Sequence, residues 1–68
     1  SADGFERLGD VLRRFSKYEE ARDTLKAGSE RYKNNRLIKL RLAETYGQLG
    51  EYRQAEKVYQ QLLQTIPN

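Results

Sequence analysis

The 68-residue sequence contains no cysteine and no histidine. Without cysteine, no disulfide can stabilise the fold, and without either residue the usual zinc sites are excluded. The same two absences remove the Ser–His and Cys–His pairs on which nucleophilic catalysis commonly depends. The five glycines are dispersed rather than gathered in a phosphate-binding loop. We therefore expect a protein that is not an enzyme and that binds no metal or cofactor.

Long apolar segments are also missing. No apolar run approaches the roughly 20 residues of a membrane span, and the N-terminus lacks the basic-then-apolar pattern of a secretion signal. We expect a soluble protein, with the cytoplasm slightly favoured as its compartment. Thirteen Lys and Arg against ten Asp and Glu give a net charge of +3, but the two signs are mixed along most of the chain. Such mixing is typical of a solvated helical surface rather than of a nucleic-acid-binding face.

Proline occurs once, at Pro67, and the helix-favouring residues Leu, Arg, Lys, Glu, Gln and Ala dominate. Apolar residues recur at steps of three and four, which predicts four helices over residues 3–15, 18–32, 36–49 and 52–66. The breaks between them are short, so neighbouring helices should run antiparallel. Because a chain of this length has a marginal core, we expect regular helix packing to supply its stability.

The breaks carry residues that commonly end or begin helices. Ser16 and Glu19 have the spacing of a capping box, an Asn within residues 33–35 can cap the third helix, and Gly50 permits a helix end. The apolar stripes between these breaks should form the core: Phe5, Leu8, Leu12 and Phe15; Tyr18, Ala21, Leu25, Gly28 and Tyr32; Ile38, Leu42, Tyr46 and Leu49; and Tyr52, Ala55, Tyr59, Leu62 and Ile66.

The sequence repeats itself after 34 residues. The segment KYEEA at residues 17–21 resembles EYRQA at residues 51–55. At a spacing of 34 the identical pairs are Arg7/Arg41, Leu8/Leu42, Tyr18/Tyr52, Ala21/Ala55 and Asn34/Asn68. These pairs fall mostly at packing positions and breaks, which indicates two copies of one helical hairpin, over residues 1–34 and 35–68.

A helix–turn–helix unit of 34 residues resembles the tetratricopeptide repeat (TPR) family, whose pattern is W-x2-L-G-x2-Y, A-x3-F and P. The first copy offers Phe5, Leu8, Gly9, Leu12, Ala21 and Leu25, with Lys33 in place of proline; the second offers Leu42, Ala43, Tyr46, Ala55, Tyr59 and Pro67, with Lys39 in place of the first aromatic residue. The resemblance implies an all-α fold of two antiparallel helix–turn–helix hairpins stacked as a short right-handed α-solenoid. It also implies a scaffold for protein–protein interaction.

In that family, ligands usually bind the concave face, which is lined by the first helix of each repeat. By the repeat register, this face comprises Asp3, Glu6, Arg7, Asp10, Arg13, Arg14, Leu37, Leu40, Arg41, Glu44, Gly47 and Gln48. Some members use Lys and Asn there to bind a C-terminal carboxylate, but this chain has Glu6 and Asp10. We expect instead a helix or extended peptide with basic and apolar residues. The alternative is that Asp3/Arg7 and Asp10/Arg14 are ordinary i,i+4 pairs on a solvated surface.

A second hypothesis is assembly through the last helix. Thr24, Gly28 and Ser29 are small residues on which the third helix can pack, whereas Val58, Leu62 and Leu63 hold the matching positions of the fourth helix without a further helix to cover them. Repeat arrays need covered or polar ends. This face could pair two copies as a homodimer or homo-oligomer, or pack against neighbouring repeats of a longer chain.

A third and weaker hypothesis concerns the basic stretch at residues 31–41. It holds Arg31, Lys33, Arg36, Lys39 and Arg41 without an acidic residue. Such a cluster can bind an anionic ligand or nucleic acid. The simpler interpretation is that Arg31 and Lys33 favour a helix C-terminus and that the others are solvated, so nucleic-acid binding is disfavoured.

Overall fold

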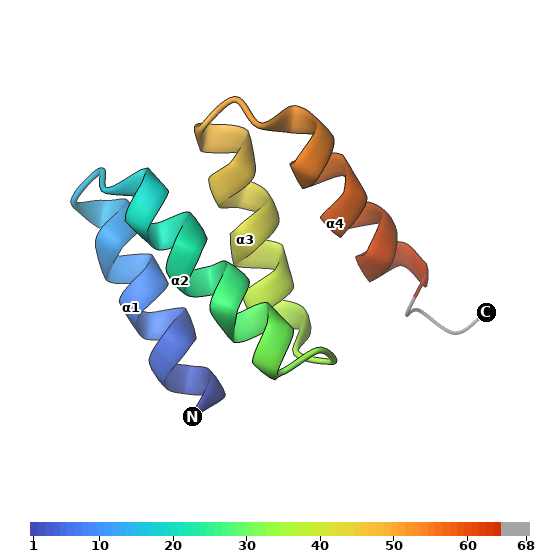
Figure 1. Ribbon diagram of the computed structural model, residues 1–68, viewed down its shortest axis with the longest axis horizontal. Helices are drawn as coiled ribbons and strands as arrows, with labels where there is room; N and C mark the ends of the chain where they lie inside the picture. The colour runs from blue at the N-terminus through green and yellow to red at the C-terminus, as the bar shows by residue number, and fades with distance from the viewer. Residues whose placement is uncertain (65–68) are drawn as a thin grey trace.

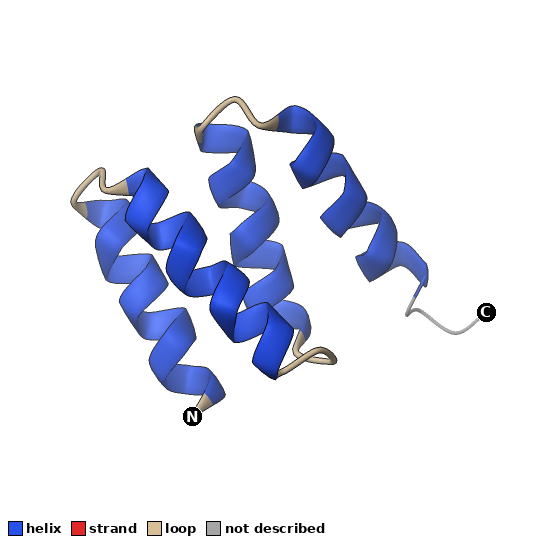
Figure 2. Cartoon of the chain, in the orientation of Figure 1, coloured by secondary structure: helices blue, strands red, loops and turns tan. Residues whose placement is uncertain are grey.

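The computed structural model describes residues 1–64, which form four α-helices and no β-strand: α1 (Ala2–Arg14), α2 (Tyr18–Arg31), α3 (Arg36–Gln48) and α4 (Tyr52–Gln64) (Figure 1; Figure 2). The predicted all-α fold of helical hairpins is confirmed, and the ends of the first three helices agree with the prediction to within one residue. The last two residues predicted for the fourth helix, together with the core prediction at Ile66 and the stop at Pro67, lie outside the described residues.

The helix bounds repeat with the period of the sequence. Both α1 and α3 contain 13 residues, and α3 begins and ends 34 positions after α1. Likewise α4 begins 34 positions after α2. Residues that are 34 apart therefore occupy equivalent places in the two hairpins. The division of the chain between residues 34 and 35 stays a prediction.

Two helix starts are capped by side chains. The Ser1 side chain accepts a hydrogen bond from the Gly4 N–H at 3.4 Å, and the Asn35 side chain accepts one from the Ile38 N–H at 2.9 Å. Each satisfies one of the backbone donors that have no partner in the first turn of a helix. The predicted capping by Asn at the third helix is thus confirmed, at Asn35.

The capping box predicted at Ser16 and Glu19 is wrong. The N-cap of α2 is Lys17, which makes no side-chain hydrogen bond to the helix. Ser16 has a positive φ of 60° and ends α1 instead, with the Lys17 N–H donating to the Leu12 carbonyl at 2.8 Å. The equivalent turn after α3 has Gly50 at φ 75°. Because Ser16 takes the left-handed conformation that closes α1, its side chain does not cap α2.

The helices pack as two hairpins, α1 with α2 and α3 with α4, and α3 contacts all three other helices. In Figure 1, α3 lies between α2 and α4, while α1 and α4 are at opposite ends of the molecule. The core cluster consists of Leu25, Ile38, Leu42, Ala43, Tyr46, Ala55, Val58 and Leu62. Most of it comes from α3 and α4, because α3 is the helix with the most neighbours.

The core prediction is wrong for several residues at the two ends. On α1, Leu8 and Phe15 are exposed, and Leu12 is only half-buried. On α4, Tyr52 and Tyr59 are exposed. The reason is that α1 contacts only α2 and α3, and α4 packs on α3. Part of the apolar stripe on each of these two end helices is therefore not covered by a neighbouring helix.

Two glycines allow α1 and α2 to approach closely. A Cβ atom at Gly9 would lie 2.6 Å from the Leu25 Cγ atom, and one at Gly28 would lie 2.8 Å from the Phe5 Cβ atom. Gly9 therefore lets the Leu25 side chain of α2 pack directly against the α1 backbone. Gly28, one of the small residues on which the third helix was expected to pack, has Phe5 of α1 as its nearest neighbour at this position. Phe5 also packs edge-on against Tyr32, with ring centroids 6.1 Å apart.

Candidate partner-binding surface

The residues predicted for the concave face lie on α1 and α3, which are in contact with each other. Their C-terminal halves are joined by Arg13. Its Nη1 atom lies 3.3 Å from the Glu44 Oε1 atom, and its Nε–H donates to the Gln48 Oε1 atom at 3.0 Å. Arg41 pairs with the same Glu44 oxygen at 3.1 Å. The structure thus brings four predicted residues into one polar network that spans both helices.

The remaining charges on α1 are more loosely held. Arg14 pairs with Asp10 at 3.1 Å, one turn away on the same helix, as the alternative interpretation expects. Within residues 1–64, Asp3 and Arg7 form no ion pair, so that part of the alternative is wrong. Glu6 is half-buried and also forms no ion pair there. The N-terminal half of α1 therefore carries Asp3, Glu6 and Arg7, none of which forms an ion pair within residues 1–64.

The N-terminal half of α3 is apolar at the equivalent positions. Leu37 is exposed and Leu40 is half-buried against the core. Both line a hollow of about 310 Å³ together with Arg36 and Leu62. The Arg36 guanidinium closes one side, donating to the Leu62 carbonyl at 3.1 Å. Since Leu37 and Leu40 are equivalent to Asp3 and Glu6, this end of the surface combines acidic and apolar side chains.

Arg13 should contribute to stability more than its neighbour Arg14. The Arg13 side chain is 17% exposed and joins two helices, whereas that of Arg14 is 76% exposed and pairs within one helix. We expect Arg13→Ala to lower the free energy of unfolding by about 1 kcal/mol and Arg14→Ala by less than about 0.5 kcal/mol. Thermal unfolding followed by circular dichroism measures both. Equal effects would show that the α1–α3 network adds nothing.

The basic residues of the 31–41 stretch do not form one cluster. The Arg31 guanidinium lies 5.7 Å from the centre of the Tyr32 ring. The Lys39 ammonium donates to Gln61 at 3.3 Å, and Arg36 and Arg41 have the partners described above. Lys33 is exposed in the turn before α3. Four of the five cations thus interact within the chain, which gives the anionic-ligand hypothesis no support.

The assembly face predicted on α4 needs correction. Val58 and Leu62 are each only 8% exposed and belong to the core. They pack on α3 because they continue the apolar stripe of Ala55 on the side of α4 that meets α3. Only Leu63 of the predicted three is exposed, at 69%, and Tyr59 is exposed beside it.

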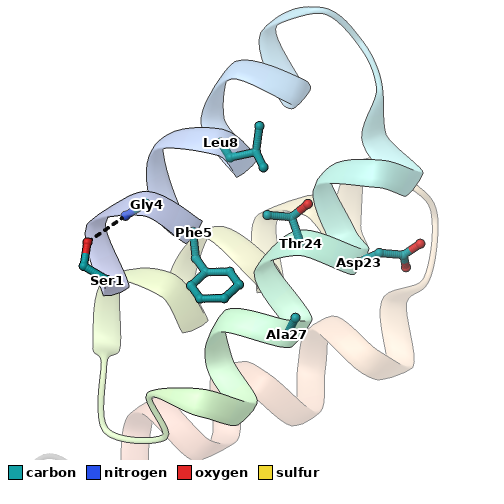
Figure 3. A pocket seen from close by; sticks show the side chains of 7 residues that line it. All are labelled: Ser1, Gly4, Phe5, Leu8, Asp23, Thr24 and Ala27. Carbon is teal, nitrogen blue, oxygen red and sulfur yellow. Dashed lines mark hydrogen bonds between the residues drawn. The ribbon is translucent and has the colours of Figure 1, made fainter.

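Sequence reasoning missed a hollow between α1 and α2. It has a volume of about 510 Å³ and is lined by Ser1, Gly4, Phe5, Leu8, Asp23, Thr24 and Ala27 (Figure 3). The hollow was not expected because the apolar spacing predicted that Leu8 would be buried in the core. Thr24, which was expected to receive the third helix, faces this hollow instead. The signal in the sequence is the pair of small residues one turn apart, Thr24 and Ala27, opposite Gly4.

The second missed feature is an ion pair between the hairpins. The Arg22 Nη1–H group donates to both Glu51 carboxylate oxygens, at 3.0 and 3.2 Å, and the Arg22 Nε–H donates to Asp23 at 3.0 Å. Hydrogen bonds to Asp23 and then Glu51 raise the pKa of the Arg22 guanidinium above its ordinary value, so it stays charged. The pair ties α2 to the turn that precedes α4.

Comparison with known families matches the chain over most of its length. The family model described as tetratricopeptide repeat matches residues 12–68, which include the end of α1 and all of α2, α3 and α4. No curated protein and no solved structure matches the sequence. Across residues 1–64, no helix has the length and apolar character needed to cross a membrane. The family match, the two helical hairpins and the 34-residue period together show that the chain belongs to the tetratricopeptide repeat family.

Proposed function

We propose that this chain is a non-enzymatic interaction module that binds a peptide or helix of a partner protein on the α1–α3 surface. Membership of the tetratricopeptide repeat family suggests a protein–protein interaction scaffold. The observation that carries the choice of surface is its division into two halves. Arg13, Glu44 and Gln48 fix the C-terminal halves of α1 and α3 to each other, which leaves the N-terminal halves to bind.

The chemistry of the N-terminal halves suggests the chemistry of the partner. Asp3 and Glu6 on α1 supply negative charge, while Leu37 and Leu40 on α3 line an apolar hollow. A peptide with Lys or Arg near a Leu- or Phe-sized residue would satisfy both. Peptides of this kind gain affinity from the apolar side chain and orientation from the charge.

Charge reversal tests the surface. We expect Asp3→Lys/Glu6→Lys to weaken binding of basic–apolar peptides by roughly tenfold, equivalent to about 1.4 kcal/mol, while the chain stays folded, because neither carboxylate is buried in the core. A fluorescent peptide array that varies the number of Lys and Leu residues supplies the probes, and fluorescence anisotropy gives the affinities.

The matched control reverses two acidic residues away from this surface. Glu19→Lys/Glu30→Lys makes the same change in net charge on exposed positions of α2. If both double variants weaken binding equally, the effect is one of net charge alone, and the proposed surface is wrong.

A further inference from the structure

The same apolar stripe is buried in one hairpin and open in the other. On α3, Ile38, Leu42 and Thr45 are buried. Their equivalents on α1, 34 positions earlier, are Gly4, Leu8 and Val11; Leu8 is 51% exposed and Val11 46% exposed. The hairpins differ in that α3 is covered by the preceding hairpin, chiefly by α2. The α1 stripe is therefore built like one that receives a helix.

This receiving surface, the α1 end face, comprises Gly4, Leu8, Val11, Thr24 and Ala27. It contains the hollow of about 510 Å³ between α1 and α2. Figure 3 shows Leu8 and Phe5 of α1 and Thr24 and Ala27 of α2 around this space. Phe15, 73% exposed, extends the apolar surface at the end of α1.

The opposite end of the molecule carries the helix surface that would fit. On α2, Arg22, Leu25 and Ser29 lie on one stripe: Leu25 is in the core with residues of α3, and Arg22 pairs with Glu51. The equivalents on α4 are Glu56, Tyr59 and Leu63, which we name the α4 end face. Tyr59 is 41% exposed and Leu63 69% exposed. The side of α4 that repeats the covered side of α2 is thus open.

The sizes of the two end faces are complementary. Where α2 has Leu25 and Ser29, the α4 end face has the larger Tyr59 and Leu63. The α1 end face has Gly4 and Thr24, which are smaller than their equivalents in the second hairpin, Ile38 and Val58. Larger side chains on one face therefore meet more space on the other, as close packing requires.

The charges are complementary as well. Within the chain, Arg22 on α2 pairs with Glu51 in the turn before α4. At a spacing of 34, Arg22 becomes Glu56, and Glu51 becomes Lys17 in the turn before α2. Because both charges change sign, Glu56 and Lys17 would also attract each other if they met as Arg22 and Glu51 do. Glu56 and Lys17 are both exposed in the single chain.

We infer that copies of this chain associate head to tail, with the α4 end face of one copy packing on the α1 end face of the next as α2 packs on α3. The contact would bury Tyr59 and Leu63 of one copy against the hollow of the other and pair Glu56 with Lys17. Because the two faces differ, a dimer leaves one end face of each kind uncovered, so further copies can add to it. It uses a surface distinct from the α1–α3 surface of the proposed function.

Two blocking variants test the geometry, with solution mass measured by light scattering over a concentration series. The wild type should grow in mass with concentration beyond a dimer. Leu8→Glu, which blocks the α1 end face, and Leu63→Glu, which blocks the α4 end face, should each remain monomeric. Mixed in equal amounts, they should form a heterodimer and stop there, because each retains one intact face. Monomeric wild type at all concentrations, or self-association of Leu8→Glu alone, would overturn the inference; the latter would mean that α4 pairs with α4.

A charge exchange tests the predicted contact without touching apolar residues. Lys17→Glu and Glu56→Lys should each weaken association about fivefold, as expected for loss and reversal of an exposed pair, and the double variant should return to within about twofold of the wild type. Glu30→Lys is the matched control and should change nothing. A double variant that associates no better than either single variant would overturn the pairing. Asp3→Lys/Glu6→Lys should leave association unchanged, which separates this test from that of peptide binding.

Discussion

Leu25→Ala is expected to leave a large share of the molecules unfolded at room temperature. The Leu25 side chain is fully buried, lies against Gly9 of α1, and belongs to the core cluster that joins the two hairpins. Removing it should cost about 2–5 kcal/mol, since the lost contacts leave a cavity that the helices fill only partly. A domain of this length has a total stability of roughly 3–10 kcal/mol. The substitution therefore removes much or all of it.

Urea denaturation followed by the helical circular dichroism signal measures this effect. The matched control is Leu63→Ala, the same chemical change at a side chain that is largely exposed, for which we expect a change within about 0.5 kcal/mol. Both are measured at low protein concentration, where the chain is monomeric. Comparable losses in the two variants would contradict the assignment of Leu25 to the core between the hairpins.

The positions of the helices could be predicted from the sequence because they depend on local properties. These properties act within one or two turns of the chain. They are the spacing of apolar residues, the cap at Asn35 before α3 and the helix end at Gly50 after it. The 34-residue repeat gave a second, independent prediction of the same helix boundaries. The prediction failed locally at Ser16, where one residue could either cap α2 or close α1 and the sequence did not show which.

The neighbours of each helix could not be predicted in the same way. A stripe such as Leu8 and Phe15 records that one side of a helix is apolar, but not whether another helix covers it. For the same reason Val58 and Leu62 were expected at an open face and lie in the core. Burial depends on which helix sides meet in space, and that is set by contacts between residues far apart in the sequence.

For the candidate surface, too, the positions of residues could be predicted but their contacts could not. The register placed Arg13, Arg41, Glu44 and Gln48 on one face, and the structure brings them together. The register did not show that they pair with each other. Long side chains reach partners at several positions, and their pairing depends on the distance between α1 and α3. The Arg22–Glu51 pair escaped notice because no local spacing connects its members.

Gly28→Leu is the second substitution expected to have a large effect. A Cβ atom at Gly28 would lie 2.8 Å from the Phe5 Cβ atom, which is fixed to the α1 backbone and cannot rotate away. The two helices must therefore separate, and we expect a loss of about 3 kcal/mol, the upper part of the usual range for overpacking. Gly47→Leu is the matched control: that helical glycine has open space around it, so replacement should leave stability unchanged or raise it by up to about 1 kcal/mol.

The second hairpin suggests how the loss can be reversed. Its equivalents of Phe5 and Gly28 are Lys39 and Leu62, so the bulky apolar residue has moved from the first helix to the second. If the two positions share one space, Phe5→Gly, which removes the Phe5 Cβ atom, should relieve the clash that Gly28→Leu creates. A double-mutant cycle should then give a stabilising coupling of at least about 1 kcal/mol between the two substitutions. Simple additivity would show that Gly28 is required for a reason other than the approach of Phe5, and that the helices of the first hairpin adjust independently of this contact.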